Sequence, residues 1–184
     1  MIEIHDIHGG IHPPERKSLS RPGELRDTTL PARLILPLRQ HLGVPAKAIV
    51  EVGDAVLGGQ VLAQAQGVMS VPVHAPTSGT ISAIELRPIA HASGLEDTCI
   101  VLETDGADES IRCEGIPEWQ TVAPSLLVER IREAGIAGMG GAGFPTAVKL
   151  NPGAAKPIDT LMINGTCEDS SSKLTFAQKS CSPK

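Results

Sequence analysis

Short apolar runs alternate with turns rich in Gly, Pro and Asp between residues 33 and 104 of the chain. Runs such as Thr80-Ile-Ser-Ala-Ile84 favour β-strands, and turns such as Gly58-Gly59 separate them. Many short strands at regular spacing are typical of a compact β-sandwich or barrel. The expected strands are 33–38, 49–52, 60–63, 71–74, 80–84 and 99–102.

The pattern changes after residues 105–122, a polar stretch that contains the single tryptophan and is expected to be a linker. Apolar residues then recur at helical spacing, which predicts a helix over 125–134 with Gly135 as its C-terminal cap. We expect this helix to pack rather than to bind a ligand. Farther along, 159–163 has the pattern of a buried strand that ends at the polar turn Asn164-Gly165.

A glycine-rich stretch, residues 138–149, carries the candidate chemistry and reads G-M-G-G-A-G-F-P-T-A-V-K. Glycine lacks a Cβ, so a ligand can closely approach the backbone N–H groups of such a loop. Pro145 suits the first turn of a helix, whose unpaired N–H groups attract anions, and Lys149 adds a positive charge one turn later. We therefore expect a phosphate-bearing ligand at this loop. The candidate cofactor-binding residues are Gly138, Gly140, Gly141, Ala142, Gly143 and Lys149.

A glycine-rich turn that binds nothing is the simplest alternative, because isolated glycine loops are weak signals. Gly138, Gly140 and Gly143 also match the G-x-G-x-x-G pattern of dinucleotide-binding Rossmann units. That pattern requires a strand directly before the loop, whereas the preceding residues have helical spacing. A P-loop is excluded because no Gly-Lys-Ser/Thr sequence follows the glycines.

Composition and charge restrict the classes of function. The net charge of −5 gives no electrostatic support for a nucleic-acid partner, and an aromatic content of 2% leaves few platforms for base stacking. The N-terminal residues lack the basic region and apolar run of a signal peptide, and no apolar stretch is long enough to span a membrane. The expected location is a reducing compartment on the cytosolic side.

The spacing of cysteine and histidine predicts no metal site. The four cysteines contain no C-x-x-C pair and lack the close spacing of ferredoxin-type clusters, so ordinary free thiols are expected. His5, His8 and His12 lie beside Gly-Gly and Pro-Pro pairs, which prevent a helix from aligning them as zinc ligands.

Several motifs resemble those of one protein family. The glycine loop is similar to the flavin-binding loop of the NADH-binding flavoprotein subunit of respiratory complex I, and more closely to that of the C subunit of the Rnf electron-transport complex. Residues 9–17 match the signature G-G-x-H-P-x-x-x-K found near the start of Rnf C subunits. The patterns V-G-D-x-V-x-x-G-Q-V-L (52–62) and A-P-T-S-G-T-I (75–81) resemble the biotinyl/lipoyl barrel-sandwich hybrid.

The resemblance implies a mixed α+β chain, with a β-rich barrel-sandwich hybrid domain followed by the start of an α/β flavin- and NADH-binding domain. One strand and two helices cannot complete a parallel sheet, so the nucleotide site would be a half-site. The expected segments are an extended N-terminal arm (1–32), the barrel domain (33–104), the linker (105–122), the partial flavin-binding domain (123–168) and a disordered or aberrant tail (169–184).

In this family, NADH reduces bound FMN, and electrons then pass singly through iron–sulfur clusters towards ferredoxin, coupled to ion movement across the membrane. The resemblance implies a fragment of the electron-input subunit of a membrane-bound, ion-translocating NADH:ferredoxin oxidoreductase, with FMN and NADH as cofactors. The implied partners are the other Rnf subunits, NADH and ferredoxin. The implied location is peripheral, on the cytoplasmic face of the bacterial inner membrane.

The chain departs from the family pattern after Asn164. The family sequence I-N-G-A-E-C-E-P corresponds to I-N-G-T-C-E-D-S in this chain. Asn164 can therefore be assigned to the flavin ring, whereas Cys167 and Glu168 cannot be placed. The [4Fe–4S] motifs of the full-length family are absent from this sequence, which leaves a fragment or a frame change as explanations.

Two other functions compete with electron input. A non-catalytic docking module would only contact partner subunits. An acyl carrier needs a lysine at a hairpin tip, and no lysine occurs from Ala48 to Val148, so the barrel can have the shape of a carrier without its chemistry. We expect His74, within V-H-A-P-T-S-G-T, to anchor a turn by a hydrogen bond.

Overall fold

The computed structural model describes Pro14, Ser18 and the ranges 28–91, 93–138 and 143–151. The described strands are β1 (Arg33–Pro37), β2 (Lys47–Ala48), β3 (Ala55–Val56), β4 (Val61–Gln64), β5 (Val73–His74), β6 (Gly79–Pro88) and β7 (Glu96–Thr104). A 3₁₀ turn, η2 (Trp119–Thr121), and the helices α1 (Pro124–Glu133) and α2 (Thr146–Lys149) follow.

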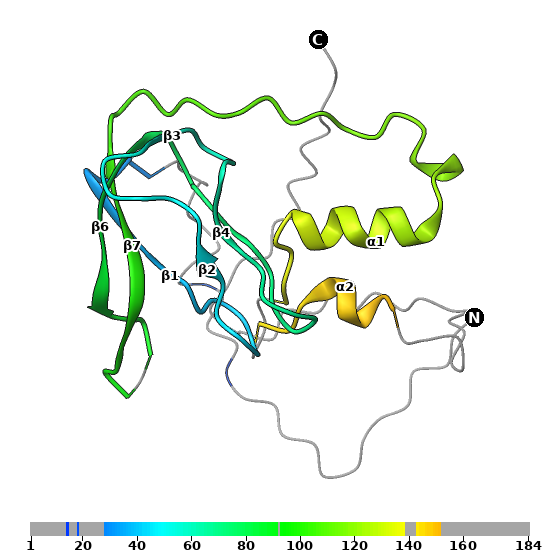
Figure 1. Cartoon of the computed structure of the whole chain (residues 1–184), viewed down its shortest axis with the longest axis horizontal. Helices are drawn as coiled ribbons and strands as arrows, with labels where there is room; N and C mark the ends of the chain where they lie inside the picture. Colours follow the sequence, from blue (N-terminus) through cyan, green and yellow to red (C-terminus); the bar gives the residue numbers. More distant parts are fainter. Residues whose placement is uncertain (1–13, 15–17, 19–27, 92, 139–142, 152–184) are drawn as a thin grey trace. The chain divides into compact units, whose positions relative to one another are not determined.

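The strands form two antiparallel sheets. One sheet has the order β1-β7-β6-β3 and the other the order β2-β4-β5 (Figure 1). The longest ladder joins β6 to β7, and its register shifts between Ile81 and Ala83. Such a bulge bends the strand and increases its twist, which helps a short sheet to curl. This strand-rich architecture confirms the β-rich class predicted from the sequence.

The core of the barrel is aliphatic, as the scarcity of aromatic residues requires. Leu62, Ile81, Ile100 and Leu102 are fully buried within it. Burial of each such side chain stabilises the fold by about 1.5–3 kcal/mol relative to exposure. Residues of both sheets therefore share one core, and Cys99–Leu102 of β7 are buried at four consecutive positions.

Strand positions agree with the sequence prediction except around residues 49–52. The strand observed here is β2, which begins two residues before the predicted one and pairs with β4. Of the predicted strand, Ile49 still donates its N–H to the carbonyl of Leu62 on β4 at 2.9 Å. The chain leaves the sheet because Gly53 adopts a φ of 101° and donates to the carbonyl of Ile81 at 2.8 Å. The additional strand β3 then pairs with the start of β6.

Helix α1 begins with Pro124 in its first turn and ends before Gly135, which has a φ of 69°. The N–H of Ile136 reaches back to the carbonyl of Ile131 at 3.4 Å, as in a glycine-capped helix end. The predicted helix and its glycine cap are confirmed. No helix among the described residues is long and apolar enough to cross a membrane. The expected strand over 159–163 lies outside the described residues.

Candidate functional site

The two flanks of the glycine loop are held side by side. Ala137 and Pro145 form an isolated antiparallel bridge. Gly138 donates its N–H to the carbonyl of Phe144 at 2.9 Å, and Thr146 donates to the carbonyl of Ile136 at 3.0 Å. The loop is therefore closed at its base like a hairpin. The predicted contact residues Gly140, Gly141 and Ala142 lie within it, outside the described residues.

Two glycines at the base of the loop have structural roles of their own. The N–H of Gly138 is already paired with Phe144, so this amide is occupied in the described conformation. Gly143 has a φ of 63°, and a Cβ there would lie 2.9 Å from both the carbonyl oxygen of Gln40 and the Cα of His41. Positive φ and close approach both require glycine at this position.

Lys149 lies against the described part of the loop. Its Nζ is 5.6 Å from the centre of the Phe144 ring, within range of a cation–π interaction. The same nitrogen would lie 3.3 Å from a Cβ placed at Gly138. The lysine is exposed at the end of α2, which begins at Thr146 directly after Pro145. The described base of the loop thus combines the positive charge of Lys149 with two glycines that lack a Cβ, Gly138 and Gly143, and these residues could hold a phosphate group.

Residues from the barrel face the same loop. A cavity of about 980 Å³ is lined by Gly138 and Gly143 on one side and by Arg39, His41 and other barrel residues on the other. The N–H of Leu42 donates to the carbonyl of Gly143 at 3.1 Å. This contribution is not visible in the sequence, because an isolated histidine and leucine between two strands have no recognisable spacing.

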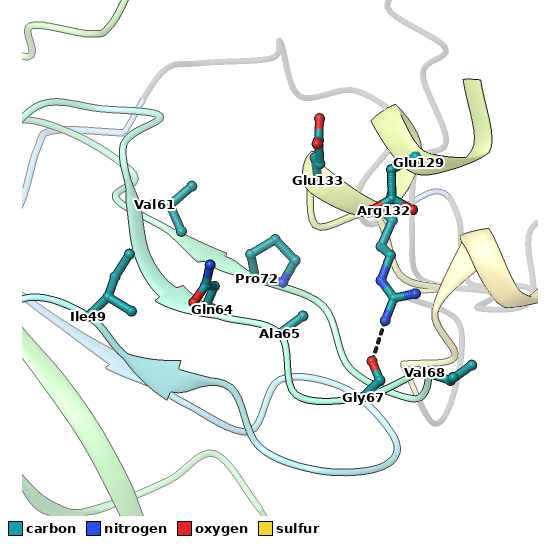
Figure 2. A pocket seen from close by; sticks show the side chains of 10 residues that line it. All are labelled: Ile49, Val61, Gln64, Ala65, Gly67, Val68, Pro72, Glu129, Arg132 and Glu133. Carbon is teal, nitrogen blue, oxygen red and sulfur yellow. Dashed lines mark hydrogen bonds between the residues drawn. The ribbon is translucent and has the colours of Figure 1, made fainter. Parts of the chain in front are cut away.

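A second cavity, of about 810 Å³, lies between α1 and the end of β4 (Figure 2). The aliphatic side chains of Ile49 and Val61 line it on the barrel side, and Glu133 lines it on the helix side. The guanidinium of Arg132 donates to the carbonyl oxygen of Gly67, which belongs to the turn after β4. The turn between β4 and β5 is thereby bonded to the last turn of α1.

His74 contacts the end of α1, beside the turn at Gly135. A Cβ at Gly135 would lie 3.2 Å from its Nδ1 and 2.8 Å from the carbonyl oxygen of Pro72. Burial lowers the pKa of His74, and a hydrogen bond with the backbone of Glu133 partly offsets that shift. A neutral imidazole is therefore packed where helix and barrel meet.

The described residues do not fit an iron–sulfur cluster or another metal site. They contain no group of three or more His, Cys, Asp or Glu side chains arranged to hold a metal. Within them Cys113 is exposed and Cys99 is buried in the core. Burial raises the pKa of the Cys99 thiol, with Asp97 adding to the shift, so it behaves as an apolar side chain.

Residues 5–107 match the family model described as the RnfC barrel-sandwich hybrid domain. The chain belongs to the RnfC family. Residues 131–174 match a second model, the Nuo51 FMN-binding domain, and this range contains the glycine loop, Lys149 and Asn164. The similarity to Rnf C subunits and the two-part fold expected from the sequence are confirmed. Asn164 lies outside the described residues, and the segment boundaries remain predictions.

Among its relatives are proteins named as the C subunit of an ion-translocating oxidoreductase complex. The one from Klebsiella pneumoniae (strain 342) is 48% identical over 167 residues, which is 90% of this chain and 22% of the relative. That of Serratia proteamaculans (strain 568) is 48% identical over 166 residues, with 90% and 23% covered. The chain therefore spans between a fifth and a quarter of the length of these RnfC relatives.

Proposed function

We propose that this chain forms part of the electron-input subunit of an ion-translocating NADH:ferredoxin oxidoreductase and binds FMN at the glycine loop. The observation that carries this proposal is the match of residues 131–174 to an FMN-binding domain, which falls on the loop predicted to hold a phosphate. The lysine beside the loop base supports the same assignment.

In this proposal the residues of the chain bind and orient the cofactor. Gly140, Gly141, Ala142 and Gly143 would hold the FMN phosphate through their backbone N–H groups, and Lys149 would supply a full positive charge. Asn164 orients the flavin ring. Bound FMN supplies the ability to take up a hydride from NADH and to release the electrons one at a time. The protein contributes position and electrostatics.

The barrel then has a supporting role. Its hairpin tip holds α1 through Arg132 and Gly67, and its β5 strand packs against Gly135. The barrel therefore carries the start of the flavin-binding region on its surface. We further propose that the chain associates peripherally with the other Rnf subunits on the cytoplasmic face of the membrane, where ferredoxin receives the electrons.

A titration of the purified chain with FMN, followed by flavin fluorescence, tests the proposal. Replacement Lys149→Gln is expected to weaken binding by about tenfold to a hundredfold, because a charge-assisted hydrogen bond contributes roughly 1.5–3 kcal/mol. The matched control is Lys47→Gln, a lysine exposed on β2. Replacement Gly141→Val is expected to abolish binding by blocking approach to the loop backbone.

A docking module without a cofactor is the second candidate, and one observation favours it. The amide of Gly138 is paired within the protein, and Gly143 packs on the barrel, so these two predicted contact residues already have internal roles. This function requires a colourless chain that fails to bind FMN at high micromolar concentration. Association with partner subunits would then survive Gly141→Val.

A further inference from the structure

The turn formed by residues 40–44 lies between the barrel and the glycine loop and contacts both. On the barrel side, Val44 donates its N–H to the carbonyl of Met69 at 3.1 Å. On the loop side, Leu42 donates its N–H to the carbonyl of Gly143 at 3.1 Å. Any shift of this 40–44 turn would therefore move an anchor of the loop.

His41 fixes the 40–44 turn from within. Its side chain is buried, with 6% of its surface exposed. The N–H of Val71 donates to Nε2 at 3.2 Å, and Nδ1 lies 3.2 Å from the carbonyl oxygen of Leu42. An N–H group can only donate, so Nε2 must be the acceptor and the proton must reside on Nδ1. The imidazole thus bridges the turn to the segment before β5.

Gly143, at the end of the glycine loop, packs tightly against the backbone of His41. A Cβ at Gly143 would lie 2.9 Å from the Cα of His41 itself. The backbone of residue 41 is therefore in direct packing contact with the end of the glycine loop, while its side chain is bonded to the barrel. One residue joins the two regions through both its backbone and its side chain.

We propose that His41 is a positioning residue that fixes the C-terminal end of the glycine loop on the barrel and so presets the loop for its ligand. The effect on FMN rests on the function proposed above, whereas the effect on loop position does not. His41 acts through Leu42 and Gly143 and has no contact with FMN in this role. In this role the barrel determines the position of the C-terminal end of the loop.

Two amide replacements separate the two bonds of the imidazole. Glutamine at position 41 can place an acceptor where Nε2 lies, and it therefore keeps the partner of Val71. Asparagine is shorter and can mimic only the Nδ1 side. Its acceptor does not reach the Val71 N–H, which is buried and would lose its partner.

Hydrogen exchange at the Leu42 amide in the full chain is the direct measurement. We expect His41→Asn to accelerate this exchange by about tenfold or more, and His41→Gln to leave it within about threefold of the unmodified chain. FMN titration of the same proteins should show a matching loss of about tenfold for His41→Asn and rescue in His41→Gln. Leu34→Ala, which loosens the core from β1, is the control for general destabilisation.

The outcomes separate the two ideas. Unchanged exchange at Leu42 in His41→Asn would overturn the positioning role, as would equal acceleration in Leu34→Ala. Faster exchange at Leu42 with unchanged FMN affinity would show that the turn does not preset the loop for flavin. Failure of the unmodified chain to bind FMN would overturn the proposed function, and the exchange data would still decide whether His41 positions the loop.

Discussion

The buried hydroxyl of Ser78 donates a hydrogen bond of 2.7 Å to Oδ1 of Asp105, joining the start of β6 to the turn that follows β7. The N–H of Glu109 donates back to the same hydroxyl at 2.9 Å. Next to it, Thr77 donates to Oδ1 of Asp108 at 2.6 Å. The A-P-T-S-G-T sequence therefore closes one end of the barrel.

Replacement Asp105→Asn should make the free energy of unfolding depend less steeply on pH in the acidic range. The hydrogen bond from Ser78, followed by that from the Ala107 backbone, lowers the pKa of Asp105 below its ordinary value of 3.8. The folded state thus binds this proton less readily than the unfolded state. The contribution is present above 3.8 and is lost as the pH falls through the lower, folded pKa.

Denaturant unfolding at a series of pH values from neutral to acidic checks this prediction. Ser78→Ala removes the same bond from the other side and should reduce the acid dependence less than Asp105→Asn does, because the hydrogen bond from the Ala107 backbone to Asp105 remains. If Asp105→Asn loses stability on acidification as steeply as the unmodified chain, the carboxylate of Asp105 does not contribute in this way.

His74 should make the free energy of unfolding fall as the pH drops below neutral. Burial, opposed by a hydrogen bond with the Glu133 backbone, lowers the pKa of His74 from 6.5. The unfolded state therefore takes up a proton first, so the contribution is complete above 6.5 and is lost as the pH falls towards the folded pKa. His74→Gln should reduce this slope. The exposed His91, replaced by glutamine, is the matched control in the same unfolding measurement.

Gly143→Ala should destabilise the chain more than Gly94→Ala. The two glycines have nearly the same φ, 63° and 65°, so the backbone strain of about 1–2 kcal/mol is common to both. Only at Gly143 would the new Cβ meet the backbone of the 40–44 turn, and nothing lies within 4 Å of one at Gly94. The difference, roughly 1–3 kcal/mol by urea unfolding, reports packing alone. Equal losses would show that the contact with the turn is loose.

Gly79→Ala should be among the most damaging single replacements in the barrel. Gly79 opens β6, and a Cβ there would overlap the carbonyl of Glu103 on β7. Relief requires the two longest strands to separate locally, at a cost of at least about 1–3 kcal/mol. Gly115→Ala, where no atom lies within 4 Å, should change the unfolding midpoint little. A well-folded Gly79→Ala protein with unchanged stability would contradict the described register.

Short sequence patterns were sufficient to predict much of the fold. The spacing of apolar residues located most of the strands, and helix α1 with its cap at Gly135 was placed within one residue. The glycine loop and its neighbouring Lys149 were also visible in the sequence, because closeness along the chain ensures closeness in space. The shift from 49–52 to β2 was not visible, since it depends on a bond from Gly53 to the distant Ile81.

The sequence by itself determined the β-rich barrel, the helix that follows, the family and the loop that could hold a phosphate. Only the tertiary structure decided what fixes that loop: Leu42 bonded to Gly143, His41 bonded to Val71, and His74 packed beneath Gly135. The physical reason is that these contacts join residues far apart in the chain. Each partner is an ordinary residue in its own segment, and it acquires a role only when the packed core brings the segments together.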